Sequence, residues 1–149
     1  RGIKQMFRDD GVRRGAYVLE DAGGGRPDVL LIASGSEVSV ALAARKLLAE
    51  EGVAARVVSM PCRERFEEQE ARYREAVLPP SVPARVSVEA GSTIGWERYV
   101  GDRGASVGID RFGASAPAER VFRELGITPE AVRDLAKSVL AAIRGGVRA

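Results

Sequence analysis

The sequence contains no histidine and a single cysteine, Cys62, among its 149 residues. Histidine is the side chain most often used for general acid–base catalysis and for metal binding, because its pKa lies near neutral pH. Its absence excludes serine–histidine–aspartate triads, imidazole metal ligands and the commonest proton shuttles. One cysteine excludes a disulfide within the chain and gives no indication of an oxidising compartment.

Long apolar runs and an excess of one charge are also missing. No apolar stretch approaches the ~18 residues of a membrane span, and the first residues lack the apolar core of a secretory signal. Lys and Arg number 23 against 21 Asp and Glu, and the arginines alternate with glutamates instead of forming a basic stripe. We therefore expect a cytoplasmic protein that binds neither a membrane nor a nucleic acid.

What is present indicates one globular domain. The composition is 45% hydrophobic and 30% charged, which is typical of such proteins. Short apolar runs alternate with helical patterns, and this order favours an α/β fold. We expect residues 1–14 to form a linker or disordered lead-in, residues 15–144 the domain, and residues 145–149 a tail.

The apolar runs predict five strands. They lie near residues 17–20, 29–33, 55–60, 85–89 and 106–110. Only a Gly-rich turn follows the first strand, whereas a parallel crossover needs about a dozen residues. The sequence therefore predicts a three-layer α/β/α fold with a five-stranded mixed sheet, mostly parallel, whose first strand is antiparallel.

Helix signals separate these runs. Ser36 and Gly52 have the residue types of an N-cap and a C′ position for one Ala- and Leu-rich helix between them. An apolar stripe predicts one further helix through the Glu- and Arg-rich stretch that follows; its members are Phe66, Tyr73 and Val77. Short helices are expected before Gly101 and over 118–125.

The last helix has the clearest pattern. Thr128 and Pro129 suit the N-cap and N1 positions. Apolar residues then recur at helical spacing at Val132, Leu135, Ala136, Val139, Leu140 and Ile143. We expect this stripe to pack on one face of the sheet.

Three places could carry chemistry. Gly35 and Ser36 stand where a buried strand becomes a helix, which is a weak candidate for an anion site; the alternative is a structural cap. Glu89 follows another strand and could act as a base or simply accept loop hydrogen bonds. Cys62 is either a small buried side chain or a nucleophile without a histidine partner. Sequence reasoning assigns no catalytic, cofactor-binding or metal-binding residue.

Trp96 and Tyr99 form the one aromatic pair that invites a functional interpretation. Aromatic side chains are enriched at protein interfaces, so the pair could anchor a partner. The same residues would serve equally well as the core of a short helix, and the sequence leaves both alternatives open.

Several ordered blocks resemble the C-terminal domain of transketolases, over about residues 12–140. They are LIASGSEV at 31–38, ARVVSMP at 55–61, FEEQ at 66–69, YREAVLP at 73–79, RVSVEAG at 85–91, IDRFGASAPAE at 109–119 and GIT at 126–128. The resemblance implies a part of a homodimeric, thiamine-diphosphate-dependent enzyme of the pentose phosphate pathway. Such an enzyme uses Mg²⁺ or Ca²⁺ and transfers a two-carbon ketol unit between ketose and aldose phosphates.

The resemblance also implies a division of labour. In the family, the cofactor, metal and substrate-phosphate groups are held by two earlier domains, whose Gly-Asp-Gly motif and histidines are missing from this sequence. We therefore expect a structural, assembly-supporting domain that is inactive alone and binds upstream domains and a second subunit. Two alternatives remain: a small-ligand or anion-binding regulatory module using the Gly35-Ser36 helix start, and an oligomerisation domain of another thiamine enzyme.

Overall fold

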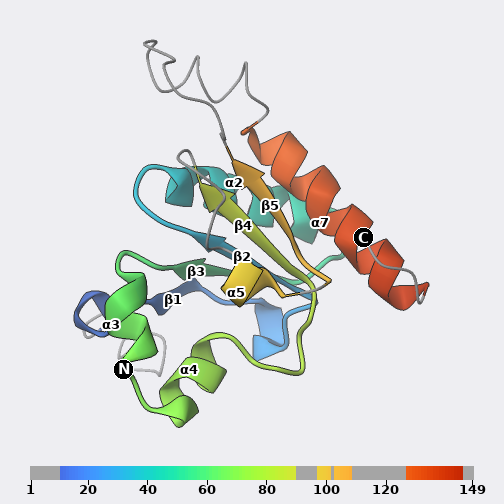
Figure 1. Cartoon of the computed structure of the whole chain (residues 1–149). Helices are drawn as coiled ribbons and strands as arrows, with labels where there is room; N and C mark the ends of the chain where they lie inside the picture. Colours follow the sequence, from blue (N-terminus) through green and yellow to red (C-terminus); the bar gives the residue numbers. More distant parts are fainter. Residues whose placement is uncertain (1–10, 90–96, 102, 109–126, 146–149) are drawn as a thin grey trace.

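The computed structural model of the chain describes residues 11–89, 97–101, 103–108 and 127–145. Helices cover both faces of a five-stranded sheet (Figure 1). The elements are β1 (Tyr17–Glu20), η1 (Gly23–Gly25), β2 (Val29–Ala33), α2 (Glu37–Glu50), β3 (Ala55–Ser59), α3 (Arg63–Glu67), α4 (Ala71–Val77), β4 (Arg85–Glu89), α5 (Glu97–Val100), β5 (Ala105–Gly108) and α7 (Pro129–Arg144).

The sheet confirms the predicted fold class. Its strand order is β1-β3-β2-β4-β5, and every pair is parallel except β1 with β3. β1 therefore lies beside β3 and not beside β2, its neighbour along the chain. The fifth strand is described as far as Gly108, so residues 109 and 110 of the prediction lie outside the described residues.

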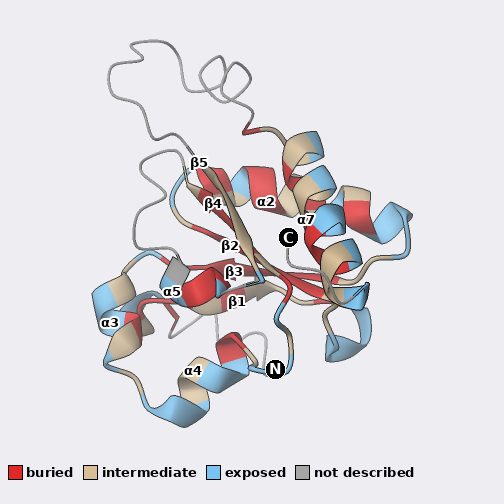
Figure 2. Cartoon of the chain, turned by 45° about the vertical axis from the view of Figure 1, so that its right-hand side comes forward, coloured by how far each residue is buried: buried red, intermediate tan, exposed pale blue. Residues whose placement is uncertain are grey.

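Two apolar layers explain why the strands read as continuous apolar runs. Along β2, Val29 and Leu31 belong to the layer under α2 and α7, whereas Leu30 and Ile32 belong to the layer under α3, α4 and α5. All of β2 and β3 is buried, as Figure 2 shows for the middle of the sheet. Each fully buried aliphatic side chain contributes about 1.5–3 kcal/mol to folding.

The α7 prediction is confirmed. The Thr128 side chain accepts a hydrogen bond from the amide of Ala131, as an N-cap does, and Pro129 opens the helix. Val132 and Val139 are fully buried against the sheet, and Leu135 is partly buried beside them. The apolar stripe thus holds α7 on the sheet together with α2.

The start of α2 differs from the prediction, whereas its end agrees. Ser36 stands at the N-cap position with helical backbone angles, and its side chain makes no capping hydrogen bond. At the other end, Gly52 has φ +78, its amide donates to Ala49, and Val53 donates to Leu48. These two bonds form a Schellman motif, in which a residue without a Cβ is favoured.

The single helix predicted through Phe66, Tyr73 and Val77 is wrong, because two short helices replace it. α3 ends at Glu67, and Glu70 has an extended backbone before α4 begins. Phe66 and Val77 are nevertheless buried in the same layer, with Tyr73 packed against them. The break therefore keeps all three side chains in one layer although they belong to two helices.

Part of the predicted lead-in is structured. Residues 11–14 are helical, and Gly15 follows with φ +92. The Gly15 carbonyl accepts a hydrogen bond of 3.0 Å from the amide of Cys62, and a Cβ at this position would collide with Cys62 and Phe66. The chain therefore enters the fold through a fixed contact with α3. Residues 1–10, the predicted helix at 118–125 and residues 146–149 lie outside the described residues.

Candidate functional site

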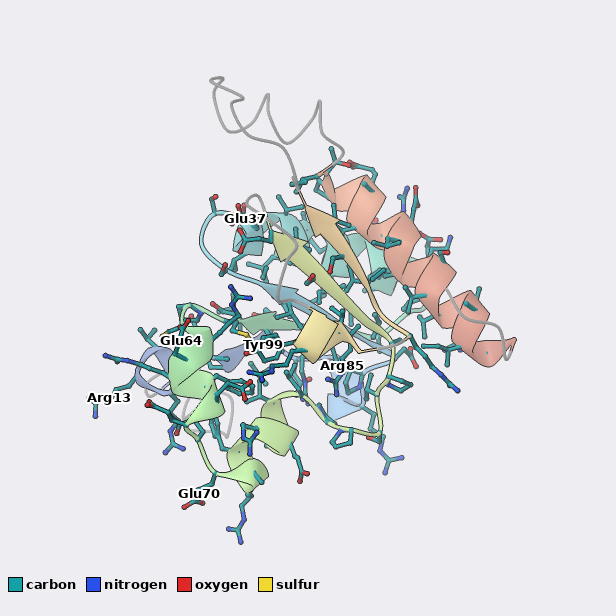
Figure 3. All side chains as sticks on the ribbon, in the orientation of Figure 1. Arg13, Glu37, Glu64, Glu70, Arg85 and Tyr99 are labelled. Carbon is teal, nitrogen blue, oxygen red and sulfur yellow. The ribbon has the colours of Figure 1, made fainter. Side chains whose placement is uncertain are left out.

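The carboxyl ends of β2 and β4 meet at one edge of the sheet, where ligands of α/β proteins usually bind. Gly35 and Ser36 are exposed there, and Gly35 has φ +59. Glu37, in the first turn of α2, is only 5% exposed, and its Oε2 lies 3.4 Å from the place that a Cβ on Gly35 would take. Figure 3 shows Glu37 at this edge, away from Arg85 and Tyr99.

Glu89 adds a second carboxylate to this edge. Its Oε2 accepts a hydrogen bond of 3.2 Å from the Ser34 hydroxyl at the end of β2. Two acidic side chains beside Gly35 and Ser36 repel an anion, so the charges at this edge oppose the anion alternative, although the Ser36 side chain does not act as a cap either. Anion binding at Gly35 and Ser36 stays a prediction.

Cys62 is half-buried at the start of α3. Its thiol donates a hydrogen bond of 3.4 Å to the Glu64 carboxylate in the first turn of the helix. Cys62 itself occupies the N-cap position of α3. The Glu64 pKa lies below its ordinary value, chiefly because of a backbone hydrogen bond and then the Cys62 contact. Among the described residues, the thiol thus hydrogen-bonds to a carboxylate and not to a basic group.

Tyr99 belongs to the core. It is 4% exposed, and its ring centroid lies 6.3 Å from that of Phe66. Within this chain, Tyr99 is therefore a core residue, which was one of the two alternatives. Burial, with a smaller contribution from Glu67, raises the pKa of Tyr99 to about 12. Trp96, its proposed companion, lies outside the described residues.

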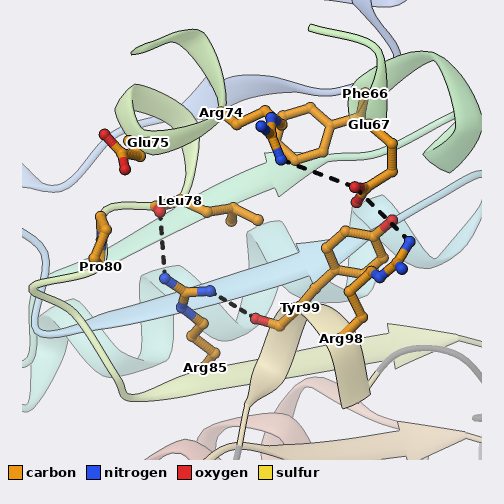
Figure 4. A pocket seen from close by; sticks show the side chains of 9 residues that line it. All are labelled: Phe66, Glu67, Arg74, Glu75, Leu78, Pro80, Arg85, Arg98 and Tyr99. Carbon is orange, nitrogen blue, oxygen red and sulfur yellow. Dashed lines mark hydrogen bonds and ion pairs between the residues drawn. The ribbon is translucent and has the colours of Figure 1, made fainter. Parts of the chain in front are cut away.

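A pocket that the sequence analysis missed lies on this face of the sheet, between α3, α4 and α5 (Figure 4). Its volume is about 480 Å³. The lining combines three arginines, two glutamates and an apolar wall: Arg74, Arg85, Arg98, Glu67, Glu75, Phe66, Leu78, Pro80 and Tyr99. These residues come from separate segments, so no sequence spacing could have shown the pocket.

Arg85 is fixed at the base of this pocket. Its Nε donates to Val82 at 3.0 Å, and its two other nitrogens donate to the carbonyls of Tyr99, Leu78 and Pro79 at 2.8, 3.3 and 2.9 Å. None of the carboxylates in the described segments forms an ion pair with it. Burial accordingly lowers the pKa of Arg85. The one sequence signal was an arginine at the start of a strand whose middle residues are buried.

The described segments contain no group of three or more histidine, cysteine, aspartate or glutamate side chains that could hold a metal ion. Within the same segments, no helix is both long enough and apolar enough to cross a membrane.

Comparison with known proteins decides the family. The family model of the transketolase-like TK C-terminal domain matches residues 15–128. The chain belongs to this family. It is 57% identical over 133 residues to Transketolase 7 of Craterostigma plantagineum, a match that covers 87% of this chain and 20% of the relative.

Solved transketolases share the fold. Transketolase from Leishmania mexicana superposes with a TM-score of 0.80 and 46% sequence identity, over 89% of this chain and 19% of the other. A protein described as a split-gene transketolase, inactive beta4 tetramer, superposes with a TM-score of 0.65 and 26% identity, over 85% of this chain and 42% of the other. The chain thus spans about a fifth of the length of the first two transketolases.

Proposed function

We propose that this chain is the C-terminal domain of a cytoplasmic transketolase, where it supports assembly and is inactive by itself. The full enzyme transfers a two-carbon ketol unit from a ketose phosphate to an aldose phosphate. One observation carries the proposal: the family match takes in most of this chain but only about a fifth of a transketolase. The remaining four-fifths are available to hold the reactants.

The described residues do not fit the cofactors of such an enzyme. A divalent ion needs several oxygen ligands at one place, and the described segments offer no such group. A diphosphate needs donors and positive charge, whereas the open sheet edge carries Glu37 and Glu89. We therefore assign thiamine diphosphate and Mg²⁺ or Ca²⁺ to the upstream domains of the full enzyme.

The partners follow from the same reasoning. We assign this domain to a homodimer, in which it contacts the upstream domains and a second subunit. The split-gene protein supports the role in assembly, though not the dimer, because it is described as an inactive tetramer and this chain's match covers 42% of it. A piece that contains this fold can thus assemble without being active.

Ketol transfer tests the proposal. The isolated chain, supplied with thiamine diphosphate, Mg²⁺ and a ketose and aldose phosphate pair, should give no turnover above the protein-free background. A chimera of Craterostigma plantagineum Transketolase 7 that carries residues 15–145 of this chain in place of its own segment should be active and dimeric. The Transketolase 7 chain truncated before that segment is the control.

Two results would contradict the proposal. Turnover by the isolated chain would show that the chemistry lies within it. A folded chimera that stays inactive at saturating cofactor would show that this domain does not support a transketolase. Titration of the isolated chain with inorganic phosphate, followed at the amides of Gly35 and Ser36, tests the anion alternative separately.

A further inference from the structure

The pocket between α3, α4 and α5 contains a positive charge, Arg85, that forms no ion pair with a carboxylate of the described segments. Arg85 lies at its base, and in the described segments its recorded partners are four main-chain carbonyls. Carbonyls satisfy the guanidinium hydrogens but carry no net charge. A half-buried cation of this kind is stabilised when an anion comes close to it.

Arg85 is also held ready for such an anion. The four carbonyls belong to Val82, Tyr99, Leu78 and Pro79, so segments on two sides fix the plane of the guanidinium (Figure 4). A guanidinium has five N–H donors, and these carbonyls use four of them. An anion would meet a preorganised group, which lowers the entropic cost of binding.

Two further arginines stand near the rim. Arg74 and Arg98 share the Glu67 carboxylate, at 3.9 Å and 3.8 Å from their nearest nitrogens. Both distances exceed a good hydrogen bond, and exposed pairs of this length contribute little. An arriving oxyanion can therefore compete with Glu67 for both guanidinium groups.

Apart from the exposed Glu75, the rest of the lining is apolar, and the pocket has a suitable size. Phe66, Leu78 and Tyr99 are buried side chains that form one wall. The volume of about 480 Å³ falls in the range of small-molecule sites, which typically combine apolar walls with a few convergent polar groups. A ligand with an apolar ring and one oxyanion matches this lining, because the ring fits the apolar wall and the oxyanion fits the arginines.

We propose that this pocket binds a small molecule that carries a carboxylate or phosphate on an apolar body. The oxyanion lies between Arg85 and the rim arginines Arg74 and Arg98, and the apolar body lies against Phe66 and Tyr99. Glu67 competes with the ligand for the rim arginines. The site is separate from the carboxyl edge of the sheet and does not depend on the transketolase reaction.

Titration of the 149-residue chain with phenyl phosphate, followed by amide NMR, tests the proposal. Resonances of α3, α4 and α5 should shift saturably, while those of α7 stay in place. Inorganic phosphate and phenol are the two half-probes, and each should bind more weakly than phenyl phosphate. Binding of phenol alone with equal strength would show an apolar site without oxyanion recognition, which contradicts the proposal.

Variants that change the charge of the pocket should shift the affinity for phenyl phosphate in opposite directions. Glu67→Gln removes the competitor and should tighten phenyl phosphate binding about two- to fivefold, while Arg98→Gln should weaken it by a similar factor. Arg85→Lys should weaken it about tenfold, since three ammonium hydrogens cannot replace five. Arg72→Gln, on the exposed side of α4 and outside the pocket, is the matched control and should change nothing.

The Glu67→Gln result is decisive even if Arg85→Lys fails to fold, because glutamine keeps the shape of the side chain. Unchanged or weaker binding by Glu67→Gln would overturn the proposal. The active chimera gives a second measurement. If the isolated chain binds the probe but the chimera does not, the adjoining protein covers the pocket, and the small-molecule proposal is wrong.

Discussion

At the scale of single residues, Arg56 joins three separate segments. It lies inside β3, where its side chain is 9% exposed. Its guanidinium donates to both carboxylate oxygens of Asp21, at 2.7 and 3.2 Å, and to the carbonyls of Ala76 and Val77 at the end of α4. One charged side chain thus ties β3 to the turn after β1 and to a helix.

Arg56→Met should lower the free energy of unfolding by about 2–4 kcal/mol. The change removes the guanidinium partner of Asp21 and leaves two carbonyls without donors, although Asp21 keeps the hydrogen bond from the Ala22 amide and partial contact with water. Urea unfolding measures the effect. The control Arg72→Met, at an exposed position of α4, should stay within about 0.5 kcal/mol of the original chain. Equal stabilities for the two variants would show that the Arg56 contacts contribute nothing.

Tyr99 gives the fold a dependence on alkaline pH. Its pKa is raised from 10.0 to about 12, chiefly by burial. Below pH 10 the phenol is neutral in both the folded and the unfolded chain, so the free energy of unfolding does not depend on its titration. Above pH 10 the unfolded chain loses the proton first, so stability should fall between about pH 10 and 12 and then level off, by roughly 1–2 kcal/mol after solvent screening.

Unfolding by urea at intervals from pH 9 to pH 12.5 measures this loss. Tyr99→Phe, which has no phenol proton, should show a smaller decrease over the same interval. The same decrease in both proteins would assign the pH dependence to other groups.

At the scale of elements, α7 shows how one amphipathic stripe positions a helix. Its fully buried residues Val132, Ala136 and Val139 face the sheet and α2, and Leu135 and Ile143 lie at the edges of the contact. Between α7 and α2, Lys137 and Arg133 both reach Glu51 on the exposed side. Exposed ion pairs contribute little, so the apolar stripe supplies most of the docking energy.

Substitution by aspartate should therefore depend on position within α7. Val139→Asp buries a carboxylate and should cost about 4 kcal/mol or more. Leu135→Asp should cost less, though still several tenths to a few kcal/mol, because this partly buried site lets the carboxylate reach water. Ser138→Asp, next to Val139 but exposed, is the control and should be near neutral. Thermal unfolding ranks the three, and equal transitions for Val139→Asp and Ser138→Asp would show that α7 is not docked.

At the scale of the whole molecule, β1 protects one edge of the sheet. It pairs with β3, and its own Val18 and the preceding Ala16 are buried in the layer with Phe66. Without β1, β3 would present unpaired backbone groups and uncovered apolar side chains. Exposed strands of this kind associate with other chains.

Truncation tests this role. A chain that starts at residue 11 should unfold cooperatively and keep the oligomeric state of the 149-residue chain. A chain that starts at residue 22 should aggregate or lose its cooperative transition. Size-exclusion chromatography and thermal unfolding distinguish the two, and a well-behaved protein starting at residue 22 would show that β1 is dispensable.

Most of the fold followed from the sequence because its signals are local. Buried parallel strands need continuous apolar runs, helices need a 3.6-residue period, and Thr128, Pro129 and Gly52 have special backbone roles. The same logic explains the antiparallel β1: too few residues follow it for a crossover. The ordered blocks indicated the transketolase C-terminal domain, and the comparisons bear out that family.

The tertiary structure decided what depends on contacts between distant segments. A single helical period runs through Phe66, Tyr73 and Val77, yet the extended backbone at Glu70 divides it into α3 and α4 while all three side chains stay in one packed layer. Ser36 has the right residue type for a cap, but its backbone is already helical, so its side chain does not cap. The Arg85 pocket was invisible for the same reason: its carbonyls and arginines lie on four segments, and only the folded chain shows that Arg85 is held by main-chain carbonyls and by no carboxylate of the described residues.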